Sequence, residues 1–127
     1  MRAIYVLGRF LVGGYFLKNG INHFQHRQQM TQYASAKGVQ PAQPAVLGSG
    51  ALMIASGLSL MLGLKPALGA LGALTFLTAV SPQMHDFWNV QDAGQRQNES
   101  INFGKNMALA AATLAFIGAE RGRRRAA

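Results

Sequence analysis

The sequence contains no cysteine, and only four of its 127 residues are acidic. The missing cysteines exclude disulfides, thiolate catalysis and thiolate metal sites. Charged residues of both signs make up 13% of the chain, which is about half the share usual in soluble globular proteins. Half of the residues are hydrophobic. A single domain surrounded by a lipid bilayer explains this balance better than a surface exposed to water.

The formal net charge of +8 raises the question of nucleic-acid binding. Four of the twelve basic residues, however, form a terminal cluster directly after an apolar run: Arg121, Arg123, Arg124 and Arg125. Arginines at the end of a membrane span meet lipid headgroups, and the sequence shows no basic face with interleaved aromatic residues elsewhere. We therefore expect the basic tail, residues 120–127, to bind anionic lipid, and we expect no nucleic-acid partner.

Two long runs of residues carry no charge. Residues 44–64 are long enough to cross a hydrocarbon core of about 30 Å, and residues 66–84 follow after Lys65, with Pro66 suited to the first turn of a helix. Two weaker runs, 3–24 and 101–119, contain Arg9, Lys18 and Lys105. Because four segments can close a bundle, the predicted fold is all-α: an integral membrane four-helix bundle in up-down-up-down order, forming a single domain over residues 1–127.

The basic residues near the span ends predict the orientation. Arg2, Lys65 and the four terminal arginines fall on one side, against Arg27, Lys37 and Arg96 on the other. The positive-inside rule then places both termini in the cytoplasm of a bacterial-type inner membrane. Arg9 splits the first apolar run and no cleavage site follows it, so this run is not expected to be a removable signal. The longer connections, 25–43 and 85–102, would share the opposite side.

In this topology eight polar or aromatic residues share one rim of the bundle: Lys18, Asn19, Asn22, His23, His85, Trp88, Lys105 and Asn106. A lysine in apolar surroundings is costly unless it is paired or reaches water. Lys18 and Lys105 are therefore interpreted as surface anchors, as hydrogen-bond donors to loop carbonyls or Asp86, or as ligand contacts. Trp88 suits the membrane interface.

Two further basic side chains, His26 and Arg9, raise the questions of metal binding and of pairing within the span. His23 and His26 share a helix face, but a metal would need His85 as a third ligand without nearby carboxylates, so we expect no metal site. Arg9 lies deep in its span and needs a partner, for which a backbone carbonyl, a lipid phosphate or Glu120 is available.

Small residues recur every four positions in the last two spans, at Gly104, Ala108 and Ala112, at Ala111, Ala115 and Ala119, and at Gly69 and Ala73. Small side chains let membrane helices approach closely. The pattern indicates either contacts within the chain or an interface with further copies or other subunits.

Five stretches in order along the chain carry a family resemblance: "LGRFLVGGYFLKNGINHF", "YASAKGV", "GLSLMLGL", "HDFW" and "FGKNMALAAATL". Their order and spacing resemble the DoxX family of small four-span membrane proteins. The resemblance implies a four-helix bundle and, for some members, association with quinone-linked sulfur oxidation or membrane oxidoreductase complexes. The family often carries an acidic residue early in the second span, whereas residues 48–55 have none, so a buried acid–base pair is not expected there.

The function is predicted from what the spans contain. They hold no acidic residue, no cysteine and no pair of haem ligands, so we expect no catalytic residue and no self-contained enzyme. The leading hypothesis is an accessory or structural subunit of a larger membrane electron-transfer complex. The alternative is a quinone-linked oxidoreductase subunit, in which Lys18, Asn22, His85 or Lys105 donates to a quinone carbonyl and Phe87 or Trp88 stacks beside it. A small-solute carrier is a further alternative.

Overall fold

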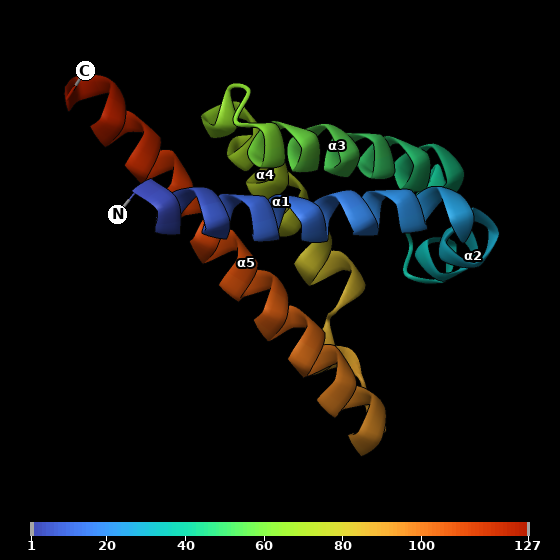
Figure 1. Cartoon of the computed structure of the whole chain (residues 1–127). Coiled ribbons are helices and arrows are strands. Elements are labelled where there is room, and N and C mark those ends of the chain that lie inside the picture. Colours follow the sequence, from blue (N-terminus) through green and yellow to red (C-terminus); the bar gives the residue numbers. More distant parts are fainter. Residues whose placement is uncertain (1, 127) are drawn as a thin grey trace.

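The computed structural model describes residues 2–126, which form helices and no strand (Figure 1). The long helices are α1 (Arg2–Gln25), α3 (Ala42–Leu62), α4 (Pro66–Met84) and α5 (Ala93–Ala126). Two short elements connect them, namely α2 (Arg27–Ala36) and the single 3-10 turn η1 (Phe87–Asn89). The prediction of an all-helical chain is confirmed. Ala127, the last residue of the predicted tail, lies outside the described residues.

Local signals set the helix ends. Gly63 closes α3 with a φ of 73°, in the left-handed region that glycine enters without steric cost, and its N–H donates to the Ser59 carbonyl at 3.0 Å. The helix therefore ends at Leu62, although the apolar run continues to Leu64. Pro66 opens α4 as expected. At the start of α5 the Asp92 carboxylate accepts a hydrogen bond of 2.9 Å from the backbone N–H of Gln95, as capping residues do.

Both connections that we expected to be long loops contain helix. Residues 25–43 include α2, and residues 85–102 include η1 and the first turns of α5, which begins at Ala93 instead of residue 101. Residues 93–100 are polar or small and, apart from Glu99, exposed, so they carry no apolar pattern by which a span is recognised. As one helix of 34 residues, α5 is about 51 Å long at 1.5 Å per residue.

The long helices pack in series, α1 on α3, α3 on α4 and α4 on α5. In Figure 1, α1 and α3 lie side by side, while α5 crosses them obliquely, and the two chain ends lie at the same end of the molecule. Long side chains join α1 to α5, since the rings of Tyr5 and Phe116 meet edge to face with centroids 5.9 Å apart. The closed four-helix bundle with aligned axes remains a prediction.

Glycines bring α1 and α3 into backbone contact. A Cβ atom added to Gly57 would lie 2.6 Å from the carbonyl oxygen of Gly13, and one added to Gly20 would lie 2.7 Å from that of Gly50. Real Cβ atoms do not approach other atoms so closely. Gly13 and Gly20, like Gly50 and Gly57, are two helical turns apart, so each helix presents a continuous smooth strip to the other.

The small residues that recur every four positions are buried on α4 but mostly exposed on α5. Gly69 and Ala73 are buried where α4 meets α3, as an internal contact requires. On α5 the internal interpretation is wrong for the residues that are exposed, namely Gly104, Ala108, Ala111, Ala115 and Ala119. That helix instead buries Asn106, Ala110, Thr113 and Glu120. The four-residue repeat identifies a strip of small residues on one side of a helix, but it does not show whether that side faces the rest of the chain or the exterior.

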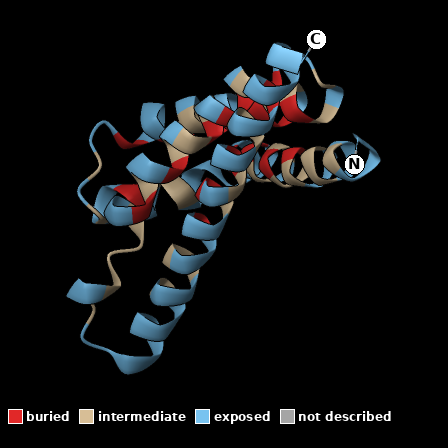
Figure 2. Cartoon of the chain, turned by 90° about the vertical axis from the view of Figure 1, so that its left-hand side faces the viewer, coloured by how far each residue is buried: buried red, intermediate tan, exposed pale blue. Residues whose placement is uncertain are grey.

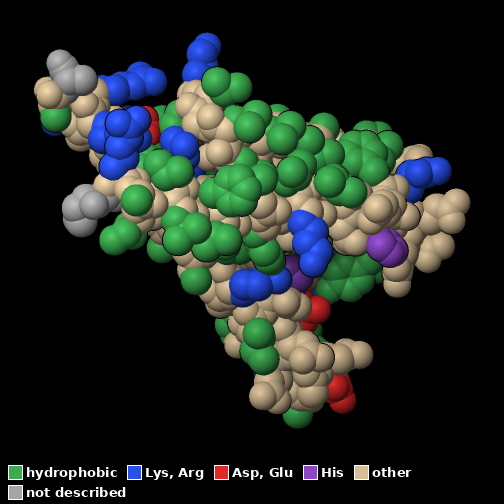
Figure 3. Space-filling model, in the orientation of Figure 1, with side chains coloured by type: hydrophobic (Ala, Val, Ile, Leu, Met, Phe, Trp, Pro, Cys, Tyr) green, Lys and Arg blue, Asp and Glu red, His purple; other side chains and the backbone are tan. Residues whose placement is uncertain are grey.

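The buried core is small and the exposed apolar surface is large. Phe16, Leu60 and Leu77 are fully or almost fully buried, but Leu58 on α3 and Leu68 and Leu71 on α4 are exposed. In Figure 2 the buried residues lie along the lines where helices meet. Figure 3 shows hydrophobic side chains over most of the face that α1 and α3 present. Apolar surface of this extent suits lipid or a protein partner. By length and hydropathy, two segments could span a membrane, residues 42–62 and 66–89.

Candidate functional site

A cleft of about 460 Å³ lies between the end of α1, α2, α3 and α4. Most of its wall is apolar and comes from Met30, Ala34, Val39, Ala45, Val46, Phe76, Ala79, Val80 and Met84. Its polar groups are few, and His23 and Tyr33 are the titratable ones. This size and composition are typical of sites that bind small, largely apolar molecules.

His23 is the buried polar side chain of this cleft, with 8% of its surface exposed. Its Nδ1 lies 2.8 Å from the carbonyl oxygen of Asn19, and its ring packs edge to face on Phe76 with centroids 6.0 Å apart. A carbonyl oxygen only accepts hydrogen bonds, so Nδ1 carries a hydrogen. The other ring nitrogen, Nε2, has no hydrogen-bond partner among residues 2–126. His23 is thus oriented by α1 and retains one unused polar atom.

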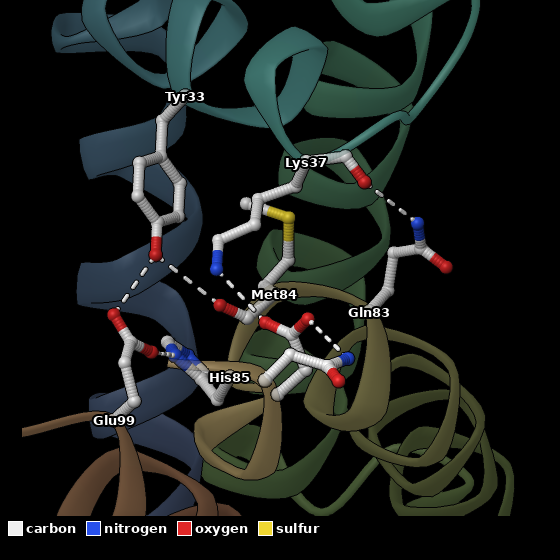
Figure 4. Close-up of polar contacts among 8 residues, drawn as sticks. Tyr33, Lys37, Gln83, Met84, His85 and Glu99 are labelled. Atoms are coloured by element: carbon white, nitrogen blue, oxygen red, sulfur yellow. Dashed lines mark hydrogen bonds and ion pairs between the residues drawn. The ribbon is translucent and has the colours of Figure 1, made fainter. Parts of the chain in front are cut away.

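A polar network closes one edge of the cleft (Figure 4). The Tyr33 hydroxyl lies 2.9 Å from Oε1 of Glu99 and 3.2 Å from the carbonyl oxygen of Met84. It has one hydrogen to donate, and the carboxylate is the nearer and stronger acceptor. The second oxygen of Glu99 lies 2.6 Å from Nδ1 of His85. Tyr33 on α2, His85 after α4 and Glu99 on α5 are therefore joined through one carboxylate.

A second set of contacts holds α2 to the chain after α4. Lys37 Nζ forms an ion pair of 2.8 Å with Asp86 Oδ1, and the amide of Asn89 donates to the other Asp86 oxygen at 3.2 Å. The Gln83 amide donates to the carbonyl oxygen of Lys37 at 3.0 Å. The two sets together are called the polar latch below: Tyr33, Lys37, Gln83, His85, Asp86, Asn89 and Glu99.

The latch shifts the acidity of two of its members. The pKa of Tyr33 is raised from 10.0 to about 12, first because burial disfavours the phenolate and then because the hydroxyl donates to the Glu99 carboxylate. The pKa of Asp86 is lowered, first because Lys37 donates to its charged form and then because Asn89 does the same. At neutral pH Tyr33 is therefore a donor and Asp86 an acceptor.

The predicted rim residues occupy different places. Lys18, Asn19 and Asn22 line a hollow of about 710 Å³ on α1, together with Tyr15. Lys105 of α5 reaches toward it, with Nζ 5.9 Å above the Tyr15 ring. Both lysines are exposed. The acceptor considered for them, Asp86, is paired with Lys37 instead.

The remaining rim residues lie apart from that hollow. His85 belongs to the polar latch, and Asn106 is buried in α5. Trp88 is 55% exposed and forms a cluster of edge-to-face rings with Phe87 and Phe103, with centroids 5.2 to 5.8 Å apart. Phe87 and Trp88 therefore stack on an α5 residue and do not line the cleft.

At the opposite end of α1, the suggested Arg9–Glu120 pair is not formed. Glu120 is buried, accepts a hydrogen bond from the Tyr5 hydroxyl and pairs with Arg123 at 3.0 Å. Arg9 lies over the Tyr5 ring at 5.5 Å, and its buried Nε has no hydrogen-bond partner within the described chain. Its guanidinium fills the space that the missing side chain of Gly63 leaves.

Sequence reasoning missed Tyr33 and Glu99 as site residues and placed Lys37 only as a surface charge. Two signals were available, since "YASAKGV" contains both Tyr33 and Lys37, and Glu99 is one of four acidic residues. The sequence does not show that these side chains contact each other, because 66 residues separate Tyr33 from Glu99 and 49 separate Lys37 from Asp86. Within residues 2–126 no three histidine or acidic side chains gather as a metal site would require.

These features define an all-helical protein with an apolar exterior, two segments able to cross a membrane and an apolar cleft beside a polar latch. The DoxX family model matches residues 4–86, about two thirds of the sequence. The chain therefore belongs to the DoxX family, which is membrane-associated. No curated protein and no solved structure matches it.

Proposed function

We propose that this chain is a multi-pass inner-membrane protein in which α1, α3, α4 and α5 all cross the bilayer, with both ends in the cytoplasm. The start of α1 and the end of α5 lie at the same end of the molecule (Figure 1). Arg2 lies there with Arg123 and Arg124 around one hollow. Positive charge of this kind marks the cytoplasmic side. At about 51 Å, α5 exceeds the hydrocarbon thickness of about 30 Å and reaches water on both sides.

Single cysteines test this topology without a background signal, because the natural sequence has none. Cysteines at Gln97 and Ala126, near the two ends of α5, should react with an impermeant thiol reagent from opposite sides of the membrane. A cysteine at Lys65 serves as the control and should behave like the one at Ala126. Labelling of Gln97 and Ala126 from one side would contradict four crossings.

For the function itself we propose that the cleft binds a molecule with an apolar body and a polar head, of the quinone class. The observation that carries this proposal is His23, a buried and oriented histidine in a mostly apolar wall, whose Nε2 has no hydrogen-bond partner among residues 2–126. Since Nδ1 holds a hydrogen, Nε2 accepts from a hydroxyl when the ring is neutral and donates to a carbonyl when it is protonated. Those two groups are the polar heads of a reduced and an oxidised quinone.

The cleft also suits the apolar part of such a ligand. Its apolar wall suits a hydrocarbon tail, and its edge at Tyr33 and Met84 is also an edge of the polar latch. This assigns the head-group contact to His23, in place of the Lys18, Asn22, His85 or Lys105 contacts considered from the sequence. A bound quinone would supply any redox chemistry, while the residues of this chain bind and orient it.

Two histidines one helical turn apart provide a matched test. His23→Phe removes the polar atom from the cleft, whereas His26→Phe changes an exposed residue outside it. We expect His23→Phe to weaken binding of a short-tailed quinone about fivefold, the value of one hydrogen bond of about 1 kcal/mol, while His26→Phe binds like the natural protein. Binding is measured by extraction and chromatography after equilibration in detergent. Equal binding by all three proteins, or binding by none, would refute the proposal.

A second function, that of an accessory subunit in a larger membrane complex, is supported by one separate observation. The small residues of α5 face outward, and membrane helices use such strips to approach a partner helix. Ala111→Phe with Ala115→Phe should remove co-purifying subunits or further copies in mild detergent. Leu114→Phe, a change at an exposed large residue on the same helix, should leave them in place. If both variants co-purify the same proteins as the natural chain, the strip faces lipid.

A further inference from the structure

The start of α1 and the end of α5 meet at a hollow that is separate from the cleft at His23. A space of about 710 Å³ lies between the first turn of α1 and the last turns of α5, lined by Arg2, Tyr5, Ala119, Glu120, Arg123, Arg124 and Ala126. Three arginines against one glutamate give this wall a positive charge. In Figure 3 the Lys and Arg side chains gather at this end of the molecule, beside hydrophobic surface.

The hollow is organised around Tyr5 and Glu120. The buried Glu120 carboxylate accepts from the Tyr5 hydroxyl and pairs with Arg123 at 3.0 Å, and the Arg123 guanidinium lies 5.1 Å from the centre of the Tyr5 ring. Arg123 is therefore fixed in direction, although a guanidinium has five N–H donors and only one is committed to the carboxylate. Arg2 and Arg124 form no ion pair or side-chain hydrogen bond with any described residue.

We infer that this hollow is a binding site for the phosphate group of an anionic membrane lipid. A guanidinium group can bind two phosphate oxygens at once. Around one space the hollow presents one fixed guanidinium group, that of Arg123, and two with no partner among residues 2–126. Ile4 and Leu7, in the same first turns of α1 but outside the lining of the hollow, are 71% and 58% exposed and give this end of the helix apolar surface that acyl chains can contact. A free phosphate ion would use the arginines but not these side chains.

The site divides the arginine tail into two kinds of residue. Arg123 and Arg124 line the hollow, but Arg121 and Arg125 do not. If the tail acted only through its total charge, its four arginines would contribute equally to lipid binding. The inference rests on the membrane location and is independent of the quinone proposal, because the cleft at His23 shares no lining residue with this hollow.

The test compares two double variants that lose the same charge. Arg2→Gln with Arg124→Gln removes the two guanidinium groups of the hollow that no described residue pairs. It keeps the hydrogen bond from Tyr5 to Glu120, so the start of α1 and the end of α5 stay joined. Arg121→Gln with Arg125→Gln is the control. The full-length chain is equilibrated in mixed micelles containing phosphatidylglycerol and phosphatidylcholine, and the phosphatidylglycerol retained per chain is counted by native mass spectrometry.

We expect the site variant to retain about tenfold less phosphatidylglycerol than the natural protein, and the control to lose less than about threefold, through its weaker general attraction. Equal losses in both variants would mean that the tail acts as diffuse charge, and would overturn the site. Inorganic phosphate at millimolar concentration should not displace the lipid; if it does, the hollow is a phosphate site without lipid selectivity. Circular dichroism on both variants checks that their helices are intact.

Discussion

The interface between α1 and α3 and the polar latch, which joins α2 to the chain after α4 and to α5, are held together in different ways. The first brings backbone to backbone through Gly13, Gly20, Gly50 and Gly57. The second spans open space with long polar side chains that are partly exposed, such as the Lys37–Asp86 pair with 22% and 23% exposure. Two backbones in direct contact cannot adjust to an added atom, whereas the side chains of the latch can change rotamer and re-form their contacts. The two regions should therefore respond to mutation very differently.

The largest effect is expected from a single methyl group in the rigid interface. In Gly57→Ala the new Cβ would lie 2.6 Å from both the Gly13 carbonyl oxygen and the Leu17 backbone nitrogen, and neither atom can rotate away. We expect the free energy of unfolding to fall by about 3 kcal/mol, the upper part of the usual range for overpacking. Loss of helical signal against detergent denaturant measures it.

The control for this change is Gly48→Ala in the same helix. No atom lies within 4 Å of a Cβ at this position, so only helix propensity changes. We expect a gain of about 0.5–1 kcal/mol. If Gly57→Ala were as mild as Gly48→Ala, the α1–α3 contact would be looser than the structure has it, and the contrast with the latch would disappear.

In the latch, removing the shared acceptor should have an intermediate effect. Glu99→Ala leaves Tyr33 and His85 without the carboxylate that joins them, and we expect a loss of about 1–2 kcal/mol, the value of two modest hydrogen bonds. Glu99→Gln should lose less, since an amide oxygen still accepts from Tyr33. Thermal unfolding measures both, with Ser100→Ala as the neighbouring exposed control. A loss as large as that of Gly57→Ala would show that the latch is rigid as well.

The ionisation of Tyr33 gives the latch a pH dependence. Its pKa is about 12 in the folded chain against an ordinary 10.0, so the folded state holds this proton more tightly. The stability that results is fully present below pH 10 and is lost as the pH rises from about 10 to about 12. Absorbance of the tyrosinate should show a component near pH 12 that Tyr33→Phe removes and Glu99→Gln moves to lower pH. An unchanged tyrosinate titration in Glu99→Gln would show that the Glu99 carboxylate does not raise the pKa of Tyr33.

The smallest effect is expected at Asp86. Its pKa lies below the ordinary 3.8 mainly because Lys37 donates to it, so its contribution to stability is present above that value and is lost as the pH falls through the lower, folded value. Lys37→Gln should raise this pKa, which carboxyl carbon NMR can follow, while Lys37→Arg should keep it low. A partly exposed ion pair contributes little, so unfolding at neutral pH should hardly change.

The sequence predicts the helical class and the start of α4 at Pro66, because each leaves a local or periodic mark. It does not reveal the α1–α3 glycine contact, since Gly13 and Gly57 are far apart and glycine also occurs where nothing is near, as at Gly48. The site is harder still. His23 is found through its place after an apolar run, but its partner is the carbonyl of Asn19, and the Tyr33–Glu99 contact depends on how α2 folds over the cleft.

The aromatic cluster on η1 and α5 has a practical consequence. Trp88 is the sole tryptophan of the sequence, so all indole fluorescence of this protein comes from one point. That point adjoins Phe103, about 30 Å along α5 from Arg123 by helix rise. Emission from the natural chain thus reports the polarity and quencher access at the end opposite the arginines, and no label has to be attached to measure how deep that end sits in a bilayer.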